Sequence, residues 1–141
     1  MRLFGLVFIS FVALGAAARA IEVGDVVRLS SMGVGRTVTA ISHTDRETAV
    51  LTVRAMEANA AEYCERAENL SLDSPKWKTC IQEALTPPTQ ITVNCRTATI
   101  ILEGEGGGAY RRARGGTWTS VANPNWVVQG DSVFGLACRR Q

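Results

Sequence analysis

Four cysteines constrain the fold of this chain more than any other feature of its sequence. They are Cys64, Cys80, Cys95 and Cys138, and the shortest spacing, from Cys80 to Cys95, is 15 residues. Structural zinc sites usually take their cysteines in closely spaced pairs, so this spacing argues against a bound metal. An even number of cysteines in an exported chain indicates disulfides instead.

The first 20 residues predict export. Arg2 gives the chain a positive start, and residues 3–18 are almost all apolar. Ala18-Arg19-Ala20 has the small-x-small pattern of a cleavage site. The apolar run is shorter than the roughly 20 residues that a membrane-spanning helix needs. We therefore expect a signal peptide over residues 1–20, a periplasmic or secreted chain that starts at Ile21, and no stable membrane insertion after cleavage.

The charges of the chain argue against a nucleic-acid partner. The sequence has 15 Lys and Arg against 13 Asp and Glu, and loss of Arg2 and Arg19 with the signal leaves 13 of each. A nucleic-acid binder needs a basic face that neutralises several phosphates. The charge is uneven along the chain, because residues 106–141 hold five basic residues and one acidic residue. A local positive surface near Tyr110 is therefore expected.

Residues 21–53 are expected to form strands joined by turns, and residues 54–86 to be helical. Apolar residues from Met56 to Ala67 recur at three- and four-residue spacing, which places them on one face of a helix. Ser74-Pro75 predicts the start of a second helix, with serine as N-cap and proline in the first turn. Pro87-Pro88 predicts its end, because proline lacks an N–H and disfavours helix in the residue before it.

Residues 90–141 are expected to form an antiparallel sheet or small barrel. Short apolar or β-branched runs alternate with turn signals such as Gly104 to Gly108. Strands are predicted at residues 91–93, 97–101, 116–121, 125–128 and 133–138. The predicted fold class is therefore α+β: one small disulfide-containing domain over residues 21–141, with a two-helix, disulfide-linked segment before a C-terminal sheet.

Four cysteines allow three pairings. We favour Cys64–Cys80, which would join the two consecutive helices, and Cys95–Cys138, which would join the first and last strands of the C-terminal sheet. On the loop-entropy model these closures stabilise by about 3 and about 4 kcal/mol. Those values are comparable with the whole net stability of a domain of this size.

No pattern in the sequence predicts an enzyme, and we expect no catalytic residue, no cofactor and no metal. His43 is the only histidine, and its neighbours in Ser42-His43-Thr44-Asp45 do not form a triad, which needs side chains from separate elements. Glu103 and Glu105 flank Gly104 and are interpreted as solvated turn charges rather than a glycosidase pair. The glycine run from 104 to 108 lacks the Lys-Ser/Thr of a phosphate-binding loop.

The segment that follows this glycine run is the strongest candidate for a binding site. Arg and Tyr carry much of the binding energy at protein interfaces, and Arg can pair with a carboxylate through two parallel hydrogen bonds. A solvated, mobile hairpin is the alternative interpretation. Trp118 or Trp126 would add a stacking surface if either faces outward beside the arginines. The predicted partner-binding residues are Gly107, Gly108, Ala109, Tyr110, Arg111, Arg112 and Arg114.

The last third of the chain resembles the bacterial inhibitors of c-type lysozyme in their periplasmic form. Gly106-Gly107-Gly108-Ala109-Tyr110 is similar to the inhibitory loop of that family, a run of small residues followed by Ala and Tyr. Trp126, Gly130-Asp131 and Cys138 are similar to the family's later Trp, Gly-Asp and final Cys. The similarity starts at Cys95.

Two features of the chain depart from that family. Its loop usually carries serines where this chain has glycines, and the helical stretch with Cys64 and Cys80 is not part of its pattern. The resemblance implies a small exported antiparallel β-barrel, closed by a disulfide near the C-terminus, that inhibits c-type lysozyme. A hairpin with Tyr110 and the arginines would enter the acidic cleft and hydrogen-bond to its two carboxylates. Such an inhibitor excludes the glycan by occupancy and needs no catalytic residue.

Two other functions remain open at this point. The second hypothesis is an accessory envelope protein that binds a cell-wall or secretion-machinery partner. The third hypothesis is a small cell-wall hydrolase that uses Glu103 or Glu105.

Overall fold

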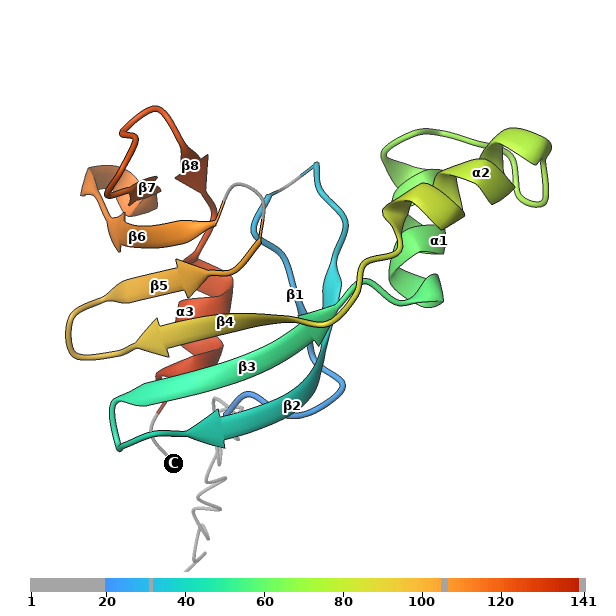
Figure 1. Ribbon diagram of the computed structural model, residues 1–141. Helices are drawn as coiled ribbons and strands as arrows, with labels where there is room; N and C mark the ends of the chain where they lie inside the picture. Colours follow the sequence, from blue (N-terminus) through green and yellow to red (C-terminus); the bar gives the residue numbers. More distant parts are fainter. Residues whose placement is uncertain (1–19, 31, 105–106, 140–141) are drawn as a thin grey trace, which may run out of the picture.

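A computed structural model describes residues 20–30, 32–104 and 107–139, which form one curled antiparallel sheet and three α-helices (Figure 1). The mixed α+β class is therefore confirmed. The predicted signal peptide lies outside the described residues, apart from Ala20. Ile21, the expected first mature residue, is buried, and its N–H donates to the carbonyl oxygen of Leu136 at 3.2 Å.

The sheet is a meander of eight strands, each paired with the next in the chain. The prediction of a sheet confined to residues 90–141 is wrong, because the strands of residues 21–53 belong to the same sheet. Thr48 to Val53 pair with Asn94 to Thr89 without a break, although the helices lie between these strands in sequence. The strands are β1 (Val26–Val27), β2 (Arg36–His43), β3 (Thr48–Arg54), β4 (Thr89–Asn94), β5 (Thr99–Leu102), β6 (Gly108–Arg112), β7 (Trp118–Ser120) and β8 (Val127–Val128).

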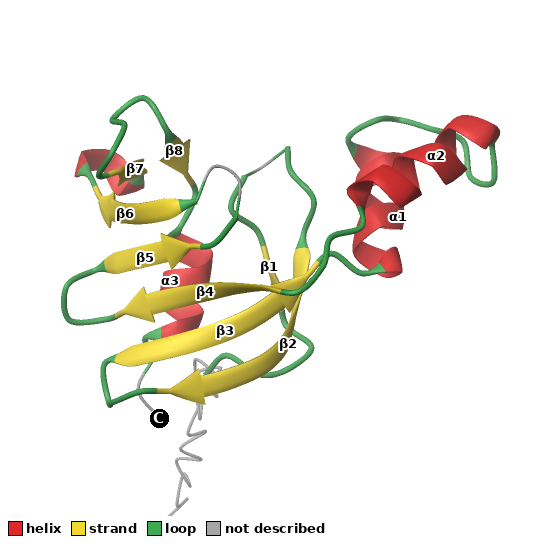
Figure 2. Cartoon of the chain, in the orientation of Figure 1, coloured by secondary structure: helices red, strands yellow, loops and turns green. Residues whose placement is uncertain are grey.

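Two helices, α1 (Glu57–Arg66) and α2 (Pro75–Ala84), form an insertion between β3 and β4 that projects from one end of the sheet (Figure 2). As predicted, Ser74 caps α2: its hydroxyl oxygen accepts the Trp77 N–H at 3.1 Å. A disulfide joins Cys64 of α1 to Cys80 of α2. Ala60, Cys64, Ile81 and Ala84 make a small buried cluster that is separate from the core of the sheet.

Polar contacts hold the insertion to the sheet, among them a hydrogen bond from Thr37 Oγ1 of β2 to Asn59 Oδ1 of α1 at 2.9 Å. At its neck, the Ala55 N–H donates to Thr86 Oγ1 at 2.9 Å, and the Thr86 N–H donates to the Ala55 carbonyl at 3.3 Å. Away from this neck, Arg28 forms an ion pair with Glu62 of α1 at 3.2 Å. The two connecting segments therefore run together, so the insertion leaves and re-enters the sheet at one place.

The predicted last strand over residues 133–138 is wrong, because this segment lies in a helix, α3 (Asp131–Ala137). A short apolar run does not by itself distinguish a strand from a buried helical turn. Here Val133 is fully buried, and Phe134, Leu136 and Ala137 pack against the same core, which is helical spacing. The second disulfide, Cys95–Cys138, consequently joins the β4–β5 turn to the end of α3 rather than two strands. Both disulfides are the pairs that the sequence favoured.

The main core lies between the inner face of the curled sheet and α3, which lies behind β4 and β5 in Figure 1. Every second residue of β3 points inward, so Ala49, Leu51 and Val53 are buried while their neighbours are less so. Trp118 of β7 is completely buried in the same core. On the opposite face, no helix of the described residues covers the sheet.

Candidate partner-binding surface

The segment predicted to bind a partner is mostly a strand rather than a loop. Gly108 to Arg112 make up β6, which pairs with β5 on one side and β7 on the other. Side chains alternate between the two faces of a strand, so this segment divides into an inner and an outer set. Tyr110 and Arg112 belong to the inner set, whereas Ala109 and Arg111 belong to the outer set.

Tyr110 lies in the core. Its side chain is 3% exposed, between its register partners Ile100 and Ser120. An aromatic ring in this position stabilises the sheet by removing apolar surface from water. The ring therefore does not project toward a partner, and any contacts that the segment makes fall to its outward side chains.

The Arg112 side chain makes its contacts within the protein. Its guanidinium forms an ion pair with Asp131 at 3.2 Å. The same group lies over the rings of Trp118 and Phe134, at 5.1 and 4.6 Å from the ring centroids. These contacts join the end of β6 to the first turns of α3. Arg112 therefore has a packing role that the sequence did not indicate.

The glycines and Arg114 do not occupy one hairpin tip. Gly107 lies in the β5–β6 turn, where its N–H donates to the Gly104 carbonyl at 2.9 Å; Glu105 and Gly106 are outside the described residues. Arg114 lies at the other end of β6, in the short 3₁₀ turn Arg114–Gly116. A five-residue strand is about 15 Å long, so these two ends cannot enter one narrow cleft together.

An exposed apolar surface lies on the outer face of the sheet beside Arg111. Ile101 is the register partner of Ala109, and the Val121 N–H donates to the Ala109 carbonyl at 2.9 Å, so Ile101 and Val121 flank Ala109. Ile101, Val121 and Val127 are each about half exposed. We call this surface the outer patch; it consists of Ile101, Ala109, Arg111, Val121 and Val127.

The large apolar residues of the outer patch were not predicted as binding residues. Period-2 alternation was the available signal, since Ile100 and Ile101 must point to opposite faces of β5. The sequence did not show which of the two faces the core. The structure places Ile100 inside and Ile101 outside.

The tryptophans differ in exposure. Trp118 is buried, whereas Trp126 is about half exposed in the connection between β7 and β8. The Trp126 carbonyl accepts the Ser120 N–H at 2.9 Å, which fixes its backbone against the end of β7. Of these two tryptophans, Trp126 is therefore the one that is exposed to solvent.

The carboxylates and histidine considered for chemistry are not brought together. Glu103 accepts the backbone N–H of Gln90 at 3.1 Å, and Glu105 is outside the described residues. His43 is at the end of β2, on a different strand. Within the described part of the chain, His, Cys, Asp and Glu side chains nowhere gather in a group of three that suits a metal ion.

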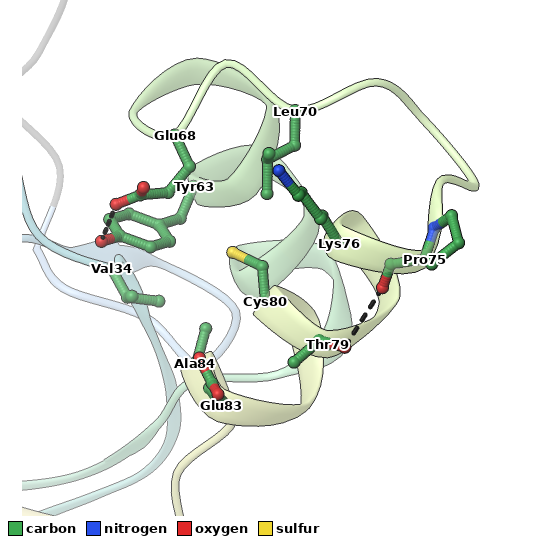
Figure 3. A pocket seen from close by; sticks show the side chains of 10 residues that line it. All are labelled: Val34, Tyr63, Glu68, Leu70, Pro75, Lys76, Thr79, Cys80, Glu83 and Ala84. Atoms are coloured by element: carbon green, nitrogen blue, oxygen red, sulfur yellow. Dashed lines mark hydrogen bonds between the residues drawn. The ribbon is translucent and has the colours of Figure 1, made fainter.

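A pocket of about 640 Å³ lies on the helical insertion (Figure 3). Apolar side chains such as Leu70 and Val34 line it together with Lys76 and the acidic Glu68. The Tyr63 hydroxyl donates to Glu68 at 2.9 Å, and this bond raises the pKa of Tyr63. None of the predicted partner-binding residues lines this pocket.

Comparisons of the chain with family models, curated proteins and solved structures give no match. Among the described residues, no helix combines the length and the apolar composition needed to cross a membrane.

Proposed function

We propose that this chain is an exported, non-enzymatic binding protein that contacts a protein partner through the outer patch. The observation that carries the proposal is the pair of exposed apolar side chains, Ile101 and Val121, on either side of Ala109, with Arg111 two residues further along β6. Single exposed apolar side chains are ordinary, but contiguous ones mark interaction sites. Arginine side chains at such a patch, here Arg111, supply binding energy and orientation.

The two disulfides support export. Disulfides persist in oxidising spaces such as the periplasm and the cell exterior, and they are rare in the reducing cytosol. Cys95–Cys138 and Cys64–Cys80 account for all four cysteines, and no thiol is free. The disulfides therefore support our proposal that the protein is periplasmic or secreted.

The partner that we propose is a c-type lysozyme. The resemblance of residues 106–110 to the inhibitory loop supports this choice, as do the antiparallel sheet and the disulfide near the C-terminus. In this proposal the contact is made by side chains that face outward. Arg111 and Arg114 reach the acidic groups of the partner, and Ile101 and Val121 provide the apolar contact, while Tyr110 supports the strand from within.

A lysis assay tests this proposal. Protein recovered after export of the full chain is mixed with c-type lysozyme, and the clearing of a cell-wall suspension is followed by turbidity. We expect inhibition near equimolar ratio, and at least a tenfold weaker effect for the variant Arg111→Ala/Val121→Asp. Arg54→Ala, at an exposed arginine of β3, is the matched control and retains inhibition. Unchanged lysis at a large molar excess of the protein would exclude lysozyme as the partner.

A cross-linking experiment tests the surface itself. A photoreactive amino acid at Ala109, in the centre of the outer patch, is expected to cross-link to the partner. The same amino acid at Thr52, on the outer face of β3, is expected not to do so. Equal cross-linking from both positions would remove the outer patch as the specific contact.

A further inference from the structure

The meander brings together three segments that are far apart in sequence. Alternate turns of an antiparallel meander lie at the same end of the sheet, so the β2–β3 and β4–β5 turns are neighbours at the end opposite the helical insertion (Figure 1). The Cys95 N–H donates to the Glu47 carbonyl at 2.7 Å and joins these two turns. The Cys95–Cys138 disulfide adds the end of α3, with a Cα–Cα distance of 5.5 Å.

The disulfide determines where two arginines lie. Arg96 follows one half-cystine and Arg139 follows the other, so closing the bond brings both to one rim. Arg46 joins them from the β2–β3 turn. Together these segments line a cavity of about 270 Å³. Its charged and polar lining includes Arg46, Arg96, Arg139, Glu47 and His43.

The cavity carries an excess of positive charge. Three guanidinium groups line it, against the single carboxylate of Glu47. That carboxylate is engaged by Arg96 at 2.8 Å. Among the described residues, neither Arg46 nor Arg139 is held in an ion pair. Within the described part of the chain, no carboxylate therefore neutralises these two guanidinium groups.

The nearby Asp45 carboxylate hydrogen-bonds within the β2–β3 turn. Asp45 accepts the N–H groups of Glu47 and Thr48 at 2.7 and 2.8 Å, and it does not line the cavity. These bonds fix the backbone of the β2–β3 turn, which contains Arg46. The carboxylate reduces the positive potential of the rim but does not compete for the interior.

We infer that this cavity binds a phosphate group, either free or as a monoester. Arg presents a planar fork of N–H donors that suits phosphate oxygens. A carboxylate has two oxygens in one plane and is satisfied by a single fork, whereas a tetrahedral phosphate offers oxygens to donors from several directions. Here Arg46 and Arg139 line the cavity from two separate segments, and Arg96, which pairs with Glu47, lines it from a third. This inference is independent of the proposed function, because none of the cavity residues belongs to the outer patch.

A titration followed by NMR tests the inference. ¹⁵N-labelled protein recovered after export is titrated with inorganic phosphate, and with glucose 6-phosphate in a second arm, with sodium chloride holding the ionic strength constant. We expect saturable shifts of amide signals in residues 44–48, 95–97 and 139. Saturation by both probes assigns the site to phosphate in general, and saturation by the ester alone assigns it to monoesters. No saturable shift with either probe would overturn the inference.

Charge-matched variants separate a built site from general attraction. Arg46→Ala/Arg139→Ala is expected to weaken phosphate binding at least tenfold. Arg54→Ala/Lys78→Ala removes the same number of positive charges at exposed positions elsewhere and is expected to leave phosphate binding within twofold. Unperturbed amide spectra in the absence of phosphate show that each variant is folded. Equal losses in both double variants would show only non-specific attraction and would overturn the inference.

Discussion

The indole Nε1 of Trp118 donates a hydrogen bond to Asp131 Oδ1 at 2.8 Å, across the boundary between the sheet and α3. The same oxygen lies 3.2 Å from a guanidinium nitrogen of Arg112. Trp118 is completely buried, and its ring packs against Phe134 with centroids 5.1 Å apart. Asp131 thereby satisfies a buried donor and holds a cation over two rings, so one side chain fixes α3 on the core.

Replacing this acceptor tests its contribution to stability. Asp131→Ala leaves the Trp118 N–H without its partner, and we expect a loss of about 1–3 kcal/mol in the free energy of unfolding. Asp131→Asn retains an oxygen acceptor and is expected to recover more than half of that loss. Urea unfolding followed by tryptophan fluorescence measures both. Equal stability of Asp131→Ala and the natural protein would show that the bond contributes nothing net.

Two glycines of the C-terminal segment provide a matched test of packing. A Cβ at Gly130 would lie 2.7 Å from Ile100 Cδ1 and 2.8 Å from the Trp118 ring. Overpacking of this kind costs about 1–3 kcal/mol, so Gly130→Ala is expected to destabilise.

Gly135 is the control for that substitution. It lies inside α3, and a Cβ there would meet no atom within 4 Å. Gly135→Ala is expected to stabilise by about 0.5–1 kcal/mol, because alanine loses less backbone freedom in a helix. The two thermal midpoints should therefore shift in opposite directions. A downward shift for both variants would contradict the packing argument.

The two disulfides are expected to protect different parts of the molecule. Cys64→Ala/Cys80→Ala removes a closure worth about 3 kcal/mol on the loop-entropy model. Because the helical cluster is separate from the sheet core, amide protection in α1 and α2 should fall while that of β3 to β6 is largely kept. Hydrogen exchange measures both regions. A parallel loss of protection in the sheet would show that the insertion unfolds only with the whole molecule.

Removing the second disulfide is expected to lower amide protection in the sheet rather than in the helical insertion. Cys95→Ala/Cys138→Ala releases the end of α3 from the β4–β5 turn, and the model gives about 4 kcal/mol for this longer closure. Protection should then fall across the sheet and α3 together. A result limited to residues next to the two cysteines would contradict this expectation.

Acid should weaken the β2–β3 turn. Backbone hydrogen bonds from Glu47 hold the pKa of Asp45 below its ordinary value, and the Arg66 and Arg28 side chains do the same for Glu62. A carboxyl group whose pKa is lower in the folded state stabilises fully above its unfolded pKa, and that contribution is lost as the pH falls through the folded value. Stability should therefore decline below about pH 4. Asp45→Asn removes one titrating group, so urea unfolding at several pH values should show a shallower decline, and an identical decline would contradict it.

Elements specified by local sequence were predictable, and elements specified by tertiary contacts were not. Ser74-Pro75 acts on the backbone of its own first turn, so the start of α2 was correct. α3 was predicted as a strand because seven residues are too few to establish a period. β6 was taken for a loop because its glycine and arginines disfavour strands, yet its neighbours on both sides supply the hydrogen bonds.

The candidate sites show the same limit. Arginines near Tyr110 were predicted from their proximity in sequence, and the structure divides them between core packing at Arg112 and the surface at Arg111. The cavity that we infer to bind phosphate was not predicted, because Arg46, Arg96 and Arg139 come from distant parts of the chain. The favoured Cys95–Cys138 pairing contained a usable signal, since it places the residues that follow each cysteine side by side.

The doubled hydrogen bond between Ala55 and Thr86 has a consequence for how this architecture can vary. Val53 and Thr89 are register partners, so the two ends of the segment that carries the helical insertion are one interstrand spacing apart, about 5 Å. That is the gap closed by an ordinary hairpin turn. A short turn, or an unrelated domain with adjacent termini, can therefore replace the helical insertion without changing the register of any strand.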